Sequence, residues 1–261
     1  MTQKKPWRTA ISRFSSESGE IAGYKHEDLI RKLDFAGSLF VLYQQRMPKP
    51  AEAKLLNAML IAAIDHSIVA SSAVTRIVSA SGVPLQASVA AGILTIGDIH
   101  GGAGQELSRR LEEWVGEARR DQLPLRDKAT QIVQALRQAS ERLEGYGHPL
   151  HPKGDGRVDA LVAVANELEL AGPHLEIALA ISDAIQVASG KSLPLNIDGV
   201  IAALASDLGF NWRLGRAFIF VPRAAGLAAH AMEEATRERG WRKIASPEDI
   251  EYDGPAPRSV D

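Results

Sequence analysis

The apolar residues of this chain recur every three or four positions from Glu27 almost to the C-terminal tail. This spacing places them on one face of an α-helix, whereas half-buried strands would show strict alternation. Only the start differs, because ISRFSS and EIAGYK flank a polar turn at 17–19 and predict a short β-hairpin. The sequence therefore predicts an all-α fold with one N-terminal hairpin.

Prolines and glycines divide the periodic region into separate helices. The pair expected at 67–81 and 84–96 is rich in alanine, serine and glycine, so we expect it either inside the protein or at the seam of a dimer. The remaining expected helices run from 27 to the proline stop at 48, and over 51–64, 103–120, 126–144, 155–171, 174–189 and 214–239.

Composition excludes several classes of protein. The 261 residues are enough for one large domain or for two lobes that share a cleft. A formal net charge of −2 predicts no nucleic-acid or membrane partner, and the absence of cysteine excludes disulfides and thiolate metal sites. The longest weakly polar run, 83–97, is shorter than the roughly 20 residues of a membrane span. With no signal-peptide pattern at residue 1, we expect a cytoplasmic protein.

Ionisable residues gather in five short segments, most of them at glycine-rich breaks between helices. Taken singly, each has an ordinary structural explanation. His66 suits a helix end, and the glycines after His100 suit a helix C-cap. Asp198 suits an N-cap, and Arg223 could extend along a helix flank into solvent. The segments are AIDHS (63–67), GDIHGGAG (97–104), GYGHPLHPKGDGR (145–157), LNIDG (195–199) and VPRAAGLAAH (221–230).

A metal site is one reading of His148 and His151, which lie three positions apart. Zinc usually takes at least three protein ligands, so His66, His100 or a carboxylate would have to complete the set. Pro149 opposes a regular helix through the pair, and the spacing then has no geometric meaning. We therefore expect no metal.

The five segments together, in this order and spacing, resemble the citrate synthase superfamily. The closest resemblance is to its citryl-CoA lyase branch, which includes the C-terminal domain of ATP-citrate lyase. It extends from GEIAGYKHEDLIRKLDFAGSLFVLYQQRMPKPAE to FVPRAAGLAAHAMEE, nearly the whole chain. It implies a two-lobed helical fold, with 1–100 and 196–261 forming a large lobe and 101–195 a small CoA-binding lobe.

The family joins or cleaves a carbon–carbon bond between the methyl carbon of an acyl-CoA and a 2-oxo acid carbonyl. The resemblance implies that Asp198 is the base at the methyl carbon, His100 stabilises the enol and His148 polarises the keto oxygen. In the cleavage direction these roles reverse. His148 would then accept the proton of the citryl hydroxyl, and Asp198 would return a proton to the acetyl carbon.

Further residues match family positions that hold the dicarboxylate. His66, Arg157 and Arg223 match residues within the cleft, and arginine suits this task because its fork binds a carboxylate through two hydrogen bonds. Arg242 is the candidate for the arginine that the family supplies from the second subunit of a dimer. The arginine–proline pair usual at that position is interrupted here.

The glycine-rich loop 145–147 matches the family's CoA contacts, and the resemblance assigns Gly145, Tyr146 and Gly147 to CoA binding. Glycine leaves space for a ligand to approach the backbone. The chain departs from the family at Pro149 and Pro152, where basic residues are frequent. Lys153 is the nearest substitute for the CoA-phosphate contact.

The resemblance favours a homodimeric lyase that cleaves citryl-CoA, or a close analogue, to acetyl-CoA and oxaloacetate. Its partners would be an acyl-CoA and a 2-oxo dicarboxylic acid, together with a separate citryl-CoA ligase. The alternative enzyme is a citrate synthase or 2-methylcitrate synthase, which joins the acyl-CoA to the 2-oxo acid. A non-catalytic subunit of an acyl-CoA complex is the alternative from another class.

Overall fold

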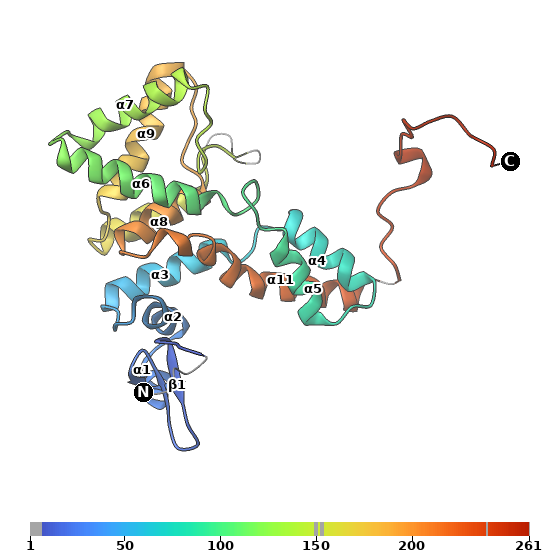
Figure 1. Cartoon of the computed structure of the whole chain (residues 1–261), viewed down its shortest axis with the longest axis horizontal. Coiled ribbons are helices and arrows are strands. Elements are labelled where there is room, and N and C mark those ends of the chain that lie inside the picture. Colours follow the sequence, from blue (N-terminus) through green and yellow to red (C-terminus); the bar gives the residue numbers. More distant parts are fainter. Residues whose placement is uncertain (1–6, 149–150, 152–153, 239, 261) are drawn as a thin grey trace, which may run out of the picture.

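The computed structural model describes residues 7–148, 151, 154–238 and 240–260. The chain begins with a small antiparallel sheet in the order β1-β2-β3. Strands β1 (Ser12–Phe14) and β2 (Gly19–Ile21) form the predicted hairpin, and β3 (Tyr24–Lys25) adds a third strand that the sequence did not indicate. The sheet lies at one end of the molecule (Figure 1).

The first helical region is divided in two, contrary to the single helix that the periodicity predicted. Helix α1 (His26–Lys32) ends at Leu33, whose backbone is extended, and α2 (Phe35–Gln44) starts one residue after Asp34. Asp34 is the N-cap of α2 and accepts a hydrogen bond from Gly37 N at 2.7 Å. This local capping overrides the continuous apolar spacing.

Helix α3 (Pro50–Ala63) begins with a proline at its first position and leads to the pair α4 (Ala70–Ala80) and α5 (Leu85–Leu94). These two helices pack on each other and on one end of α11, and they project from the rest of the molecule (Figure 1). The expectation that they lie inside the chain is wrong, since their buried residues are mostly small and Leu94 is 85% exposed. The alternative, that this pair of helices lies at the interface of a dimer, stays a prediction.

The remaining helices form the main body. They are α6 (Ala103–Arg120), α7 (Leu125–Gln138), α8 (Gly156–Glu167), α9 (Pro173–Ser189), α10 (Ile197–Asp207) and α11 (Ala217–Arg237).

Helix α10 lies at the centre of this body, in contact with α3, α6, α8 and α9. It is buried on all sides, which explains why its sequence is apolar around its whole circumference. Its buried stretch is Gly199, Val200, Ile201, Ala202, Ala203, Leu204, Ala205 and Ser206.

One continuous hydrophobic core joins residues of α2 and α3 to residues of α6–α10 and the start of α11. The division into lobes at residues 100 and 195 stays a prediction. Beyond α11 the chain continues as an exposed tail that extends away from the body (Figure 1). No helix among the described residues combines the length and apolar character that crossing a bilayer requires.

Candidate active site

A cleft of about 430 Å³ lies where α10, α11, the loop after α3 and the glycine-rich loops meet. Its volume is within the range of small-molecule sites. Apolar side chains such as Ile96 and Ile219 complete the lining. The cleft brings together seven of the residues selected from sequence: His66, His100, Gly147, His148, Arg157, Asp198 and Arg223.

Asp198 faces the cleft from the first turn of α10. The N-cap explanation for it is wrong, because Asn196 holds that position and its side chain accepts from Gly199 N at 3.0 Å. Burial raises the pKa of the Asp198 carboxyl, although Arg223 and Arg157 act in the opposite direction. The Asp198 carboxyl therefore gains and loses its proton at a pH closer to neutrality than an exposed aspartate does.

Hydrogen bonds hold both the backbone and the ring of His100. Its backbone pairs with Gly97 through hydrogen bonds of 3.0 and 3.1 Å, and its Nε2 lies 3.1 Å from Ser71 Oγ. Ser71 N also donates to Nε2, at 3.4 Å, so this nitrogen accepts and Nδ1 carries the hydrogen of the neutral ring. Burial, aided by Arg223, lowers the pKa of His100 and keeps the ring neutral.

His66 and His148 lie edge to face, with ring centroids 5.4 Å apart. Burial lowers the pKa of both imidazoles, and neighbouring positive groups, Arg157 among them, lower it further. Both rings are therefore neutral near pH 7. A neutral imidazole can accept a proton from a hydroxyl group or donate a hydrogen bond to a carbonyl oxygen.

Two arginines are anchored at the C-terminal end of α3. Arg157 Nη1 donates to the Ala62 carbonyl at 3.3 Å, and Arg223 Nε donates to the Ala63 carbonyl at 3.0 Å. The last carbonyls of a helix have no partner within it and carry its negative dipole end, so they suit cations. Arg223 is only 7% exposed, so the view that it extends into solvent is wrong.

Asp155 forms an ion pair with Arg157. Nε and Nη2 of Arg157 donate to the carboxylate at 3.0 and 2.6 Å, and Asp155 also caps α8. Burial by itself would raise the pKa of Asp155, but the hydrogen bonds from Arg157 outweigh it and lower the pKa to about 2. The pair holds the guanidinium at the cleft.

The predicted CoA loop packs closely against neighbouring residues. Gly145 has a φ of +84°, and a Cβ on it would meet Leu107 at 2.4 Å. Tyr146 is buried and its hydroxyl donates to the Ala178 carbonyl at 2.9 Å, so its side chain serves the core. Gly147 lines the cleft. Lys153 lies outside the described residues.

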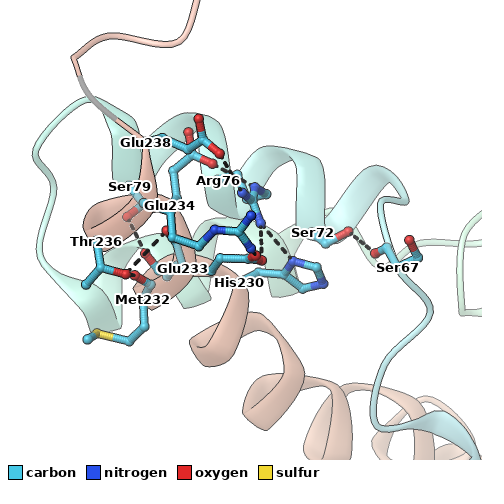
Figure 2. A network of polar contacts seen from close by, with 12 residues as sticks. Ser67, Ser72, Arg76, Ser79, His230, Met232, Glu233, Glu234, Thr236 and Glu238 are labelled. Carbon is cyan, nitrogen blue, oxygen red and sulfur yellow. Dashed lines mark hydrogen bonds and ion pairs between the residues drawn. The ribbon is translucent and has the colours of Figure 1, made fainter.

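Arg242 does not line the cleft. It binds Glu234 through two hydrogen bonds of 2.7 Å, and Glu234 is also bound by Arg76. Figure 2 shows the contacts of Arg76 and Glu234, which tie α4 to the end of α11. The role of Arg242 in a neighbouring subunit stays a prediction.

Four contacting residues were not singled out in the sequence. Ser71 and Asn196 occupy the starts of α4 and α10, and Asp155 could have been found as an N-cap two positions before Arg157. His230 binds Asp65 at 3.0 Å and so ties α11 to the segment that carries His66. No local signal indicates this last contact, because it joins residues far apart in the chain.

A comparison with known protein families finds a match over most of the chain. The family described as "Citrate synthase, C-terminal domain" matches residues 6–246. The chain belongs to the citrate synthase family. The resemblance inferred from sequence motifs is thereby confirmed.

Solved members of the citrate synthase family share this fold. Citryl-CoA lyase from Hydrogenobacter thermophilus superposes with a TM-score of 0.90 at 35% identity, over 98% of both chains. ATP citrate lyase of Methanosaeta concilii, in complex with (3S)-citryl-CoA, superposes with a TM-score of 0.82 over 98% of this chain and 43% of its own. At 24% identity, this second likeness shows the fold alone.

Among curated citrate synthase relatives, "Citrate synthase 2" of Bacillus subtilis is 29% identical over 212 residues, which are 80% of this chain and 53% of that protein. The chain thus spans about half the length of these curated relatives. The cleft itself offers neutral imidazoles, one carboxyl group of raised pKa and two arginines. Such a set suits acid–base chemistry on a carboxylate substrate.

Proposed function

We propose that this protein cleaves citryl-CoA, or a close analogue, to acetyl-CoA and oxaloacetate. The observation that carries the proposal is the convergence of His100, His148 and Asp198 with Arg157 and Arg223 in one cleft. The likeness to citryl-CoA lyase over 98% of both chains supports the cleavage direction.

In the proposed reaction the arginines bind the carboxylates of the citryl group. His148, neutral because its pKa is lowered, accepts the proton of the citryl hydroxyl. The resulting oxygen forms the carbonyl of oxaloacetate as the carbon–carbon bond breaks, and the bonding electrons pass into the thioester as an enolate. Asp198 in its protonated form, favoured by its raised pKa, delivers a proton to the terminal carbon and completes acetyl-CoA.

His100 stabilises the enolate that forms between these two proton transfers. Its Nε2 is occupied by Ser71, so its Nδ1–H is the donor for the thioester oxygen. A donor fixed before the reaction stabilises developing charge without reorganisation. Because the ring is neutral, it donates a hydrogen bond without giving up a full proton.

Two separate assays of the purified protein test the proposal. Citryl-CoA should yield acetyl-CoA and oxaloacetate, with oxaloacetate followed by a coupled dehydrogenase. Acetyl-CoA plus oxaloacetate should release no free CoA thiol. Thiol release in the second assay without cleavage in the first would overturn the lyase proposal.

A citrate or 2-methylcitrate synthase is the second candidate, favoured by the curated relatives named citrate synthase. It predicts thiol release from acetyl-CoA or propionyl-CoA in the presence of oxaloacetate. A non-catalytic subunit is the candidate from another class, and it predicts that Asp198→Ala leaves every activity unchanged.

The proposal includes a cytoplasmic homodimer supplied with citryl-CoA by a separate ligase. Exposed apolar residues on the projecting α4–α5 pair support the dimer, Leu85 being 44% and Leu94 85% exposed. The partner subunit would then bring its own tail near this cleft. Light scattering that gives the mass of one chain would refute the dimer.

A further inference from the structure

Three histidines converge at the cleft, and the proposed reaction leaves one of them, His151, without a role. One ring nitrogen from each of His66, His148 and His151 lies within 4.8 Å of the others. The ring centroids of His148 and His151 are 4.9 Å apart, and those of His66 and His151 are 5.5 Å apart. The three side chains come from two segments, the loop after α3 and the loop before α8.

Two of these rings have a nitrogen that nothing satisfies. Nε2 of His66 and Nε2 of His151 are buried and have no hydrogen-bond partner among the described residues. A buried polar atom without a partner is unfavourable, so such atoms are rare unless they serve a ligand. Two of them in the same three-histidine cluster mark this position as one that suits a ligand.

The three ring nitrogens can bind one metal ion once they move slightly closer together. Zinc bound to imidazole at about 2.0–2.1 Å in a tetrahedron requires nitrogen atoms roughly 3.4 Å apart. Side-chain rotation of half-exposed rings closes the difference from 4.8 Å. No helix through Pro149 is needed, so the sequence-based objection to a metal site does not apply.

The surrounding charges also permit a cation. Arg157 is paired with Asp155, and the nearby Asp65 carboxylate offsets part of the charge of Arg223. Asp155 Oδ2 lies 3.9 Å from His151 Nε2, beyond hydrogen-bond distance, and its negative charge favours a cation beside that ring.

We propose that His66, His148 and His151 form a site for a divalent transition metal, with Zn²⁺ as the best-suited ion, that blocks the substrate cleft. Three imidazoles are a common zinc ligand set and leave a fourth position for water. A bound ion withholds His66 and His148 from the substrate. The blocking part rests on the proposed function, whereas metal binding does not.

Calorimetric titration with Zn²⁺ alone, in a non-chelating buffer, tests the site without any activity. Wild type should bind one ion per chain, and His151→Asn and His66→Asn should each weaken binding at least tenfold. His26→Asn, at the start of α1 and outside the cleft, is the matched control and should bind as wild type does. Equal affinity of His151→Asn and wild type would overturn the site.

X-ray absorption at the zinc edge of the loaded wild-type protein provides a check that needs no variant. The expected spectrum has three imidazole ligands and one lighter oxygen ligand. A shell made only of oxygen, or fewer than two imidazoles, would overturn the site even if zinc binds elsewhere.

The blocking effect is measured next. Zn²⁺ should inhibit citryl-CoA cleavage by the wild type, EDTA should restore it, and His151→Asn should keep its basal rate while losing at least tenfold in zinc sensitivity. Zinc bound at this site without inhibition would overturn the block. If no cleavage or condensation is found at all, the proposed function fails, and calorimetry still decides the metal site.

Discussion

Asp198 and Asn196 divide two tasks within one helical turn. Asn196 accepts the capping hydrogen bond from Gly199, which leaves the Asp198 carboxyl to face the cleft. Burial then raises the pKa of Asp198. A carboxyl group in this state can deliver a proton to carbon, which an ordinary exposed aspartate near neutrality cannot do.

Asp198→Ala and His100→Ala should lower kcat by about 10²–10⁴ and change KM little, because these side chains act mainly in the transition state. Steady-state kinetics of citryl-CoA cleavage measures both constants. Asp183→Ala, an exposed aspartate on α9, is the control and should match wild type.

Arg157→Ala and Arg223→Ala should instead mainly raise KM, because in the proposed reaction the arginines hold the substrate carboxylates in the ground state as well. The same assay measures the effect. Large kcat losses with unchanged KM for both arginine variants would contradict the assigned division of roles.

Ser71 is a positioning residue for His100. Removing its hydroxyl in Ser71→Ala eliminates the 3.1 Å contact with Nε2, worth about 1 kcal/mol, and should lower kcat roughly fivefold. KM should stay near the wild-type value, which distinguishes loss of orientation from loss of fold. Ser79→Ala on the same helix removes a hydrogen bond to the Ala231 carbonyl and should leave kcat unchanged.

At the scale of elements, the C-terminal end of α3 organises the site. Its last carbonyls anchor Arg157 and Arg223, and α11 must approach it closely for the second contact. Gly226 permits this approach, since a Cβ there would lie 2.3 Å from the Ile64 carbonyl oxygen. A backbone atom cannot move aside as a side chain can.

Gly226→Ala should therefore destabilise the protein by about 1–3 kcal/mol through overpacking and should also raise KM by displacing Arg223. Gly116→Ala on α6 is the matched control, because its nearest atom lies at 3.7 Å and belongs to a flexible arginine. That control should be neutral or stabilising by up to about 1 kcal/mol. Denaturant unfolding of both variants gives the comparison, and equal free energies of unfolding would contradict the close-approach argument.

The cap of α8 gives a pH dependence of stability. The pKa of Asp155 falls from 3.8 to about 2 on folding, so the folded state binds fewer protons. The stabilisation is complete above pH 3.8 and is lost as the pH falls through about 2. From the shift it amounts to about 2 kcal/mol.

Asp155→Asn should thus lower the free energy of unfolding by about 2 kcal/mol at pH 7 and by much less near pH 2, as followed by urea unfolding at several pH values. Asp159→Asn, an exposed position in the first turn of the same helix, serves as the control. A pH-independent difference between Asp155→Asn and wild type would count against the ion pair.

At the scale of the whole molecule, the cleft is open and its rim is apolar. Ile99 lines it and is fully exposed, and glycines with positive φ, Gly101 and Gly147, lie in the loops on either side. An exposed apolar rim is favourable only if something covers it when substrate binds. Movement of the expected small lobe would supply such a cover and would exclude water from the enolate.

Binding of CoA together with oxaloacetate should therefore reduce the radius of gyration measured by small-angle scattering. Crystal structures with and without these ligands should differ in the angle between residues 101–195 and the rest. Oxaloacetate alone is the comparison that separates the two ligands. Identical scattering curves and identical angles would contradict closure.

Much of the fold follows from local sequence. The boundaries of α6 and α9 agree with the periodic pattern to within a residue, because proline and glycine end helices through their own backbone geometry. The break between α1 and α2 was missed, because capping by Asp34 competes with apolar spacing that continues across it. For the pair α4 and α5 the sequence left the interior of the chain and a dimer seam as alternatives, since composition does not say which chain covers a helix.

The sequence by itself determined the all-α class, the motif order and seven of the residues that line the cleft. Only the tertiary structure decided that Asn196 rather than Asp198 caps α10, that Ser71 selects the tautomer of His100, and that Asp155 holds Arg157. It also decided that His151 joins His66 and His148. Asn196 and Asp155 act on residues two or three positions away, so the structure only chose between local alternatives there. The contacts of Ser71 and His66 join segments far apart in the chain, and they depend on how helices pack, which no local pattern encodes.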